Sequence, residues 1–383
     1  MTSYRSFGRS VSYIDQQNLL PAFKECWPEY IELGSQAIQA TVKRVDFAFQ
    51  RFFKGLGGYP KYKSIRYYSG FTYPGKAGWK ALTNGKHGQL QITNLGTIRM
   101  RGHARTWGLP TTCTIVYRAS ERKWYASITV ECVPVRETGP GDIGYDLGCK
   151  DAITFSDGRK MSKPAFIKAG DIAVKAASKR LRRKRRPDRK AGIKPSSPWR
   201  RASRDVARLK RKVANQRADW LHKLTCDTVR CNSLIAGETL NVKGTTARAK
   251  KGKRKKQKAG LNRSILSVGF GMVGPMLAYK SVEAGGFHLE SPTRHLKPSQ
   301  RCVMGWELTP KTLKDRIHRC SNPACGHVKT RDVNAAQVNL AWTRGQEHSL
   351  ASVESPSSTS CGSMKQLGAK KRKKPPDRKA DCR

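Results

Sequence analysis

Three acidic side chains stand at the ends of apolar or glycine-rich segments, in a chain that has few acids. Asp146 lies in "GDIGYDLG", Glu238 lies in "NSLIAGETLNV", and Asp332 opens the alanine-rich segment "RDVNAAQVNL". Carboxylates on two neighbouring strands and at one helix start can converge, and three of them could hold two magnesium ions about 4 Å apart. Such ions activate water against a phosphodiester. Taken singly, each acid is more often a turn or capping residue.

The elements between these acids predict the fold that would bring them together. Residues 141–162 read as three strands, joined by a glycine turn and an Asp157-Gly158 turn. A strand with Glu238, a helix near residues 267–286, a short strand "FHLESP" and a final helix at Asp332 come later. This order describes a ribonuclease-H-like fold of the RuvC nuclease type. The helix N-terminus at Asp332 favours the ionised form of its carboxyl. Between the strands, residues three and four apart form the apolar stripe of a long helix: Val206, Leu209, Val213, Trp220 and Leu224.

Three cysteines lie between the last predicted strand and Asp332. Cys302 stands in "SQRCVMGWELTP", and Cys320 and Cys325 stand in "RCSNPACGH". A structural zinc site needs about four ligands, which these thiols and His318 or His327 would supply. The alternative is a metal-free hairpin held by apolar contacts. Six earlier cysteines predict buried free thiols of a reducing compartment: Cys26, Cys113, Cys132, Cys149, Cys226 and Cys231.

The positive charge predicts a polyanionic partner. The 383 residues include 76 Lys and Arg against 27 Asp and Glu, a formal net charge of +49. Nucleic acid would offset this self-repulsion; the alternative is non-specific RNA binding, as by ribosomal proteins. Tyrosines interleaved with cations can stack on bases while the cations reach phosphates. The candidate contacts are these residues and a later run of arginines: Tyr59, Lys61, Tyr62, Lys63, Arg66, Arg182, Arg183, Arg185, Arg186, Arg200 and Arg201.

The remaining segments divide by composition. Residues 16–57 read as helices with Ser35 as an N-cap, and residues 88–135 read as strands that would form a small sheet or barrel. The tail from residue 346 is serine-rich and then basic, which is typical of disorder. We expect a cytoplasmic protein, because the N-terminus lacks the apolar core of a secretory signal and no uninterrupted apolar run approaches a membrane span. One apolar face of the N-terminal helices is predicted at Ile38, Val42, Val45, Phe49 and Phe52.

The segments that carry the acids resemble a known family. "IGYDLGCKDAITFSDG", "IAGETLNVKG" and "CGHVKTRDVNAAQVNL" are similar to the three RuvC motifs of TnpB proteins, which insertion sequences encode and which are ancestral to type V CRISPR effectors. Softer matches extend the resemblance to about residues 15–345, and Asp146, Glu238 and Asp332 match the family's metal-binding acids. The cysteines depart from the family's two Cys-x-x-Cys pairs, since position 305 has no cysteine and four residues separate Cys320 from Cys325.

The resemblance implies an RNA-guided DNA endonuclease. A guide RNA from the transposon end would pair with double-stranded target DNA beside a short adjacent motif. The three acids and two magnesium ions would then cut the DNA, in a prokaryotic cytoplasm at the nucleoid. We expect a monomer, with a dimer as the alternative. The same sequence is compatible with a nuclease-impaired, guide-RNA-dependent DNA-binding protein or repressor, with a transposon RNA chaperone, and with a compact type V CRISPR effector.

The implied fold is an α+β multidomain protein. A wedge β-barrel domain (residues 1–15 and 87–138) would carry an inserted helical recognition domain (16–86). A RuvC-like α/β nuclease domain (139–297 and 331–345) would carry a zinc-ribbon-like insertion that contacts target nucleic acid (298–330). A disordered basic tail (346–383) would follow.

Overall fold

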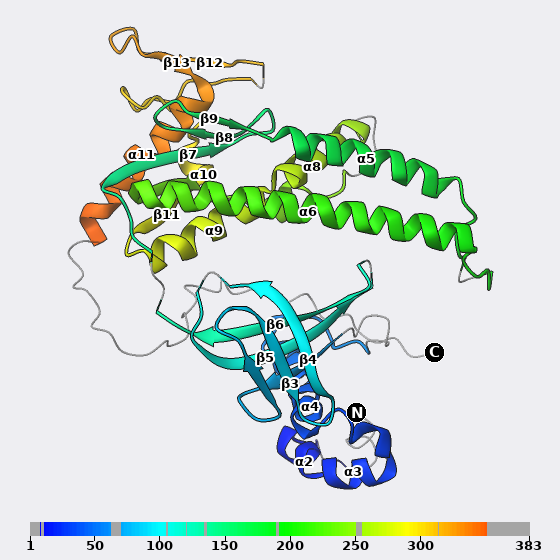
Figure 1. The fold of residues 1–383 in the computed structure, drawn as a ribbon. Coiled ribbons are helices and arrows are strands. Elements are labelled where there is room, and N and C mark those ends of the chain that lie inside the picture. Colours follow the sequence, from blue (N-terminus) through cyan, green and yellow to red (C-terminus); the bar gives the residue numbers. More distant parts are fainter. Residues whose placement is uncertain are drawn as a thin grey trace, which may run out of the picture.

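The structure is a computed structural model that describes residue 8 and residues 11–62, 70–104, 106–119, 121–133, 136–188, 191–249, 255–312 and 314–350. Two groups of elements lie one above the other in Figure 1, with the N-terminal helices and strands β1–β6 below and the long helices with a mixed sheet above. The predicted tail falls outside the described residues, apart from the end of the last helix.

The N-terminal segment is helical, as predicted. Ser12 caps the first helix by accepting a hydrogen bond from Asp15 N, and Asp15 accepts one from the Ser12 backbone N–H. Gly34, with a φ of 72°, occupies the cap position of the longest helix here, so the predicted Ser35 cap is one residue too late. Of the predicted apolar face, Ile38 is buried, Val42, Phe49 and Phe52 are half-buried, and Val45 is 46% exposed. The helices are α2 (Tyr13–Asn18), α3 (Leu20–Cys26), η1 (Pro28–Tyr30) and α4 (Ser35–Phe53).

Six strands follow and form two three-stranded sheets, in the orders β1-β5-β6 and β2-β3-β4. The two sheets share one core, with Tyr73, Trp79 and Cys113 at its centre and Ala37 of α4 packed into it. Residues 70–82 therefore belong to these sheets, which corrects the prediction that 16–86 is helical. The strands are β1 (Gly70–Pro74), β2 (Trp79–Leu82), β3 (Lys86–Ile92), β4 (Gly96–His103), β5 (Leu109–Arg118) and β6 (Lys123–Glu131).

The second unit is built on a five-stranded sheet in the order β11-β10-β7-β8-β9. The antiparallel hairpins β7-β8 and β8-β9 match the predicted three strands, and β10 pairs in parallel with both β7 and β11. The strands are β7 (Gly141–Leu147), β8 (Asp151–Phe155), β9 (Lys160–Ser162), β10 (Asn232–Glu238) and β11 (Phe287–Ser291). A separate hairpin, β12 (Ile317–Arg319) with β13 (Val328–Thr330), precedes the last helix.

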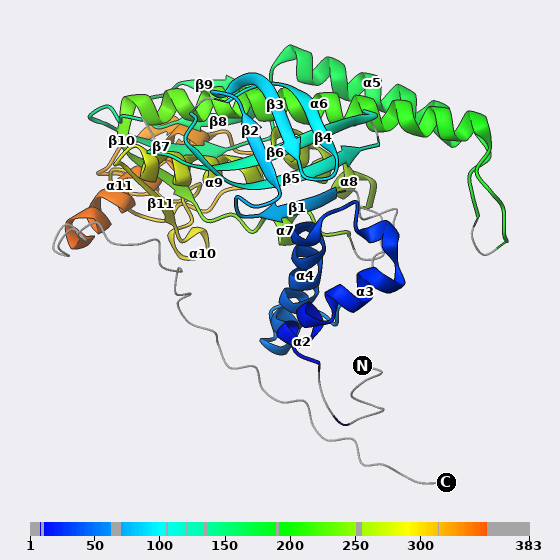
Figure 2. The ribbon, with the colours of Figure 1, turned by 60° about the horizontal axis from the view of Figure 1, so that its bottom comes forward.

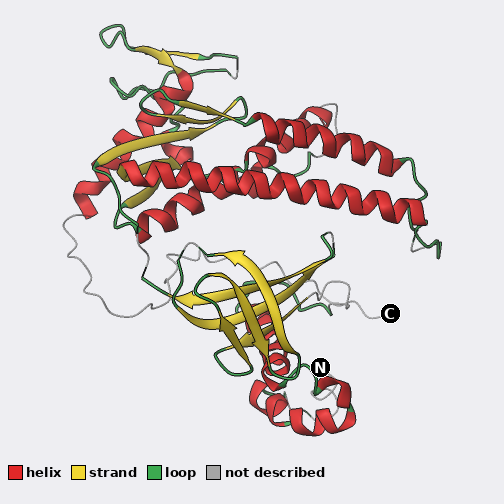
Figure 3. Cartoon of the chain, in the orientation of Figure 1, coloured by secondary structure: helices red, strands yellow, loops and turns green. Residues whose placement is uncertain are grey.

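Helices cover both faces of this sheet, as Figures 1 and 3 show. The predicted long helix is α6, whose buried positions include Val206, Val213 and Leu221. α6 and α9 pack on one face of the sheet and α11 packs on the other. The helices are α5 (Ala165–Arg182), α6 (Ser197–Cys231), α7 (Val242–Thr245), α8 (Lys255–Val268), α9 (Phe270–Glu283), α10 (Thr293–Leu296) and α11 (Arg331–Leu350).

Alternation along β7 separates these two faces. Ile143 and Tyr145 enter the apolar core with α6 and α9. Gly144 and Asp146 therefore face α11. A Cβ at Gly144 would lie 2.0 Å from the carbonyl oxygen of Ala336, so only glycine permits this approach of α11 to the strand.

The structure bears on two expectations drawn from composition. By length and composition, the segment Lys255–Glu283 passes as a membrane span, but 56% of its apolar window is buried inside the protein, as for a core helix. The described cysteines are free, as predicted, yet Cys26, Cys132, Cys149 and Cys231 are exposed, and Cys226 is half-buried. Of the six early cysteines, Cys113 alone is buried.

Candidate functional site

Three separate elements carry the predicted acids to one place. Asp146 is the sixth residue of β7, Glu238 ends β10, and Asp332 is in the first turn of α11. β7 and β10 run in parallel with Ala236 opposite Gly144, and each acid comes two residues later on its strand. Asp146 and Glu238 therefore lie beside each other on the face that α11 covers.

The start of α11 brings the third acid to this pair. Asp332 precedes Ala336 by one helical turn, and Ala336 touches Gly144. Because Gly144 and Asp146 share a face of β7, Asp332 projects toward Asp146. Arg331 stands beside it, with Nη2 and Nε each 3.2 Å from Asp332 Oδ1.

Burial and neighbouring charge disfavour ionisation at two of these acids. Burial, and then the charges of Glu238 and Asp332, raise the pKa of Asp146 well above its usual range, while Arg331 opposes the shift. Burial raises the pKa of Glu238 to about 7. The metal-free site therefore retains protons at Asp146 and Glu238 that a free carboxyl would lose.

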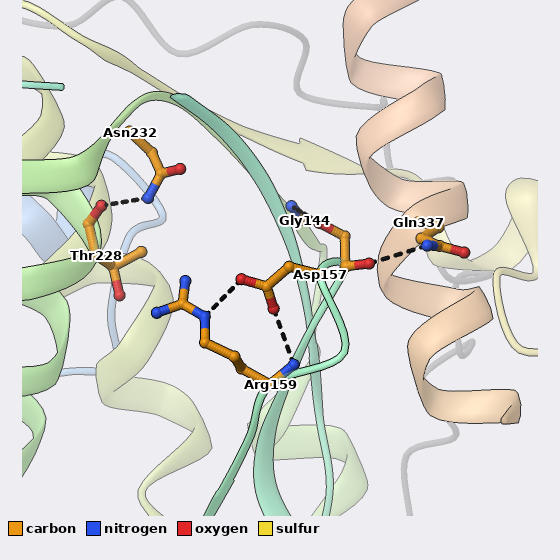
Figure 4. A network of polar contacts seen from close by, with 7 residues as sticks. Gly144, Asp157, Arg159, Thr228, Asn232 and Gln337 are labelled. Atoms are coloured by element: carbon orange, nitrogen blue, oxygen red, sulfur yellow. Dashed lines mark hydrogen bonds and ion pairs between the residues drawn. The ribbon is translucent and has the colours of Figure 1, made fainter. Parts of the chain in front are cut away.

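Hydrogen bonds from α11 fix the helix against the sheet. Asn339 is fully buried, donates to the Tyr145 carbonyl at 3.1 Å, and accepts a hydrogen bond from Ser291 Oγ at 2.8 Å. Figure 4 shows Gln337 and Gly144 at the turn after β8: Gln337 donates to the Ser156 carbonyl, while Gly144 N donates to Ser156 Oγ. These bonds join α11 to β7, β8 and β11, the strands around the acids.

The opposite face of β7 holds a second polar group. Tyr145 Oη lies 3.1 Å from His288 Nε2, and burial lowers the pKa of His288 to about 4, which keeps it neutral. A Cβ at Gly237 would lie 2.4 Å from the Tyr145 ring, so glycine is required there. Tyr145, Glu238 and Glu290 line a cavity of about 360 Å³ between β10 and α9. The packed ring of Tyr145 therefore lies on the face of β7 opposite the acid site.

The three predicted thiols also meet. Cys302, Cys320 and Cys325 form a cluster whose sulfurs all lie within 4.8 Å of one another. Among the described residues, no histidine nitrogen or carboxylate oxygen joins that cluster, so His318 and His327 do not complete it. Burial would raise the pKa of the Cys302 thiol, but hydrogen bonds from the N–H groups of Gly305 and Met304 and from the thiols of Cys320 and Cys325 together lower that pKa.

Comparisons with known proteins bear on both clusters. A family described as "Probable transposase" (OrfB_IS605) matches residues 126–249, and the Cas12f1-like TNB domain matches residues 270–339. "Putative RNA-guided DNA endonuclease InsQ" of Escherichia coli (strain K12) is 28% identical over 315 residues, which are 80% of this chain and 74% of that protein. A "Putative RNA-guided DNA endonuclease" of Streptomyces pristinaespiralis is 28% identical over 344 residues, 87% of this chain and 78% of that one. These matches agree with the resemblance of the three acid-bearing segments to TnpB proteins.

Alignments with two solved structures cover most of the chain. A chain in "Cryo-EM structure of the Cas12f1-sgRNA-target DNA complex" aligns with 80% of this chain and 70% of its own length, with a TM-score of 0.49 and 12% identity. The "CRISPR-Cas12f Ternary Complex" aligns with 88% of this chain and 77% of its own, with a TM-score of 0.36 and 11% identity.

The predicted nucleic-acid contacts fall in two places. Tyr62 is 97% exposed and Tyr59 is 44% exposed, beside exposed Lys61, whereas Lys63 and Arg66 lie outside the described residues. The predicted arginines are mostly exposed, around the end of α5 and the start of α6: Arg182, Arg183, Arg185, Arg186, Arg200 and Arg201. In Figure 2 this end of the α5–α6 pair projects from the rest of the molecule.

A basic groove adjoins that projection. A hollow of about 600 Å³ lies between the β5–β6 turn and α6, and Arg122, Lys123, Arg201, Arg204 and Arg208 line it. Glu121 lines it too, and its carboxylate lies 3.5 Å from Arg211 Nε. The sequence offered no signal for this groove, because its cations come from two distant segments.

Three further residues of the site were missed from the sequence. Arg331 pairs with Asp332, and Asn334 on α11 is fully buried against the Cys302 loop. Glu290, on the strand next to Glu238, has a pKa that burial raises. Arg331 and Asn334 both lie in the "RDVN" segment, but only their contacts in the structure show that they hold Asp332 and the Cys302 loop.

Proposed function

We propose that this chain is an RNA-guided DNA endonuclease of the TnpB type that hydrolyses phosphodiesters at Asp146, Glu238 and Asp332. The observation that carries the proposal is the convergence of these acids from two parallel strands and one helix start. The names of the E. coli and Streptomyces relatives support the same activity. The order of the mixed sheet, a three-strand meander followed by two parallel strands, supports a ribonuclease-H-like nuclease domain.

The acid cluster suits magnesium. Carboxylate oxygens are the donors that this ion prefers, and a cation at the cluster would offset the burial and the neighbouring negative charges that raise the pKa of Asp146. Two bound ions would supply an activated water and stabilise the leaving oxygen. Asp146, on which the charges of both other acids act, would hold the ions together with Glu238 and Asp332. Arg331 holds Asp332 in place through the same oxygen in two contacts.

The remaining parts would hold the nucleic acids. We assign the guide RNA from the transposon end and the double-stranded target DNA to the basic groove and the exposed arginines at the α5–α6 end, whose cations suit phosphates. The ranges 1–15 with 70–138 and 16–69 are proposed as wedge and recognition domains. Residues 139–297 with 331–345 are proposed as the nuclease domain, and 298–330 as the zinc-ribbon-like insertion. Residues 70–82 join the wedge strands.

A cleavage assay tests this proposal. The chain is expressed with its own transposon end, the RNA that co-purifies is sequenced, and the complex is given matched double-stranded DNA with randomised flanking sequence and magnesium. We expect a discrete RNA ending at the transposon boundary and cleavage beside one short flanking motif. Chelation of magnesium abolishes the cleavage.

Two results would contradict the proposal in different ways. Guide-dependent binding without cleavage would support a DNA-binding repressor instead. Bulk cellular RNA in the purified protein, with no guide-dependent binding, would support a non-specific RNA chaperone. A CRISPR array beside the gene, in place of transposon ends, would assign the same chemistry to a compact type V effector.

A further inference from the structure

The cysteine cluster has the dimensions of part of a tetrahedral metal site. Zinc binds thiolates at about 2.3 Å, so two sulfurs on one tetrahedral zinc stand about 3.8 Å apart. Cys302 Sγ and Cys325 Sγ lie 3.8 Å apart, and Cys320 Sγ lies within 4.8 Å of both. Three corners of the tetrahedron are therefore provided.

Gly305 stands at the fourth corner. It follows Cys302 by three residues, the spacing of a Cys-x-x-Cys zinc knuckle. A Cβ built there would lie 3.2 Å from Cys325 Sγ and 3.5 Å from Cys320 Sγ. The Gly305 N–H also points at Cys302 Sγ, at 3.4 Å. The residue thus faces all three sulfurs but has no side chain to offer.

The two nearby histidines point elsewhere. His318 is fully buried, and its Nδ1 contacts Lys311 Nζ rather than a sulfur. Nε2 of His318 and Nε2 of His327 are both buried without a hydrogen-bond partner, and the two rings lie 5.9 Å apart. Neither ring nitrogen lies within 4.8 Å of all three sulfurs.

We propose that Cys302, Cys320 and Cys325 form a three-thiolate zinc site whose fourth position, at Gly305, is open and takes a water from solvent. Cys320 and Cys325 are only half-buried, so solvent reaches this side of the cluster. The inference rests on the zinc-ribbon assignment in the proposed function but not on nuclease activity. With one protein ligand fewer than a closed structural site, the zinc exchanges more readily.

Asn334 connects this open site to the last acid. Its Nδ2 donates to the Arg301 carbonyl at 2.6 Å and its Oδ1 accepts from Val303 N at 3.3 Å, so it holds both neighbours of Cys302. Asn334 is two residues after Asp332 on α11. The loop that carries the first thiol is thus fastened to the helix turn that carries the third acid.

The test counts ligands on the metal. The full-length protein is purified under reducing conditions, its zinc is quantified, and the zinc environment is measured by X-ray absorption at the zinc edge. Two variants are compared: Gly305→Cys adds a thiol at the open corner, and Gly305→Ala is the matched control that adds the same Cβ without a sulfur. A competing chromophoric chelator measures zinc affinity in all three proteins.

We expect one zinc per wild-type chain, with three sulfurs, one oxygen and none of the outer-shell scattering of an imidazole ring. Gly305→Cys should show four sulfurs and bind zinc roughly a hundredfold more tightly, whereas Gly305→Ala should show three sulfurs and no tightening. A Cβ at Gly305 makes close contacts, so Gly305→Ala also measures any strain that the added Cβ causes in both variants.

Three results would overturn the proposal: no zinc after saturation of the wild type, imidazole scattering that identifies a histidine as fourth ligand, or equal zinc affinities in the cysteine and alanine variants. The DNA cleavage assay is read separately. A chain that binds zinc in the expected way but cuts no DNA contradicts the proposed nuclease alone.

Discussion

The acid cluster and the cysteine cluster are both triads, yet they are built in opposite ways. The acids come from positions 146, 238 and 332, and strand pairing within a packed five-stranded sheet brings them together. The cysteines come from one stretch of 24 residues around a hairpin of two three-residue strands. The acids repel one another and are held together by the core, whereas the thiols would depend on the proposed zinc to hold their hairpin. A site supported by the core can store repulsion; a site on a small hairpin cannot.

Removing one acid should have the largest effect and should separate activity from stability. Asp146→Asn should lower the cleavage rate by at least about a thousandfold, because it removes the central magnesium ligand. The same variant should raise the unfolding temperature of the metal-free protein, since burial beside two like charges opposes ionisation of Asp146. Guide-dependent cleavage and calorimetry measure the two effects.

Asp157→Asn is the matched control for that change. Asp157 is an exposed acid at the turn after β8 and pairs with Arg159 at 2.5 Å, as Figure 4 shows. The substitution Asp157→Asn should leave cleavage unchanged. An Asp146→Asn protein that is less stable than wild type would show that the core does not hold repelling charges at this site.

Adding one methyl group at Gly144 should disturb the acid cluster through its support. The Cβ of Gly144→Ala would meet the Ala336 carbonyl, so α11 must move away from β7. We expect the free energy of unfolding to fall by about 1–3 kcal/mol and cleavage to fall further, because Asp332 moves with the helix. Denaturant unfolding and cleavage at a temperature where the variant stays folded measure these effects.

Gly260→Ala provides the comparison for this substitution. Gly260 lies within α8 with open space around it, so alanine there should stabilise by about 0.5–1 kcal/mol. Equal changes in unfolding free energy and cleavage at both positions would show that the Gly144–Ala336 contact does not hold α11 in place.

The affinity of the acid cluster for magnesium should depend on pH, with a smaller effect than the substitutions above. Burial sets the pKa of Glu238 at about 7 and raises that of Asp146. Protons therefore compete with magnesium below neutral pH, and affinity should rise by about tenfold per pH unit from pH 5 toward pH 7 for each proton displaced.

Without magnesium, stability should change in the opposite direction. The folded state retains protons that the unfolded chain loses near pH 4. The free energy of unfolding should therefore fall as the pH rises from about 4 to about 7. Titration calorimetry in buffers of different ionisation enthalpy counts the protons released on metal binding. No proton release at pH 6 would contradict the raised pKa values.

Loss of a thiol should have the smallest effect on the whole protein. Cys302→Ser should abolish zinc binding but change the global free energy of unfolding by less than about 0.5 kcal/mol, because the cluster supports only its hairpin. Hydrogen exchange should rise in β12 and β13 and stay unchanged in β7 and β10. Cys231→Ser, at an exposed cysteine, should change neither. Global destabilisation by Cys302→Ser alone would mean that the two clusters fold as one unit.

The sequence alone identified both triads and most of the strands and helices around them. Asp146, Glu238 and Asp332 were recognisable because an acid in an apolar or glycine-rich segment of so basic a chain is unusual. The alternation of β7 and the stripe of α6 were readable because strands repeat every two residues and helices every 3.6. Cys302, Cys320 and Cys325 were recognisable as an incomplete set of zinc ligands by their number and spacing.

Only the tertiary structure decided what surrounds the triads. Strand periodicity could not show that β1 leaves the helical segment to pair with distant β5, because pairing partners are set by packing across the chain. Likewise, the approach of α11 to Gly144, the fastening of the Cys302 loop by Asn334, and the exclusion of His318 and His327 from the sulfurs depend on directions in space. Residue types determine which atoms can bind a metal; the packing of sheet, helix and hairpin determines which of them meet.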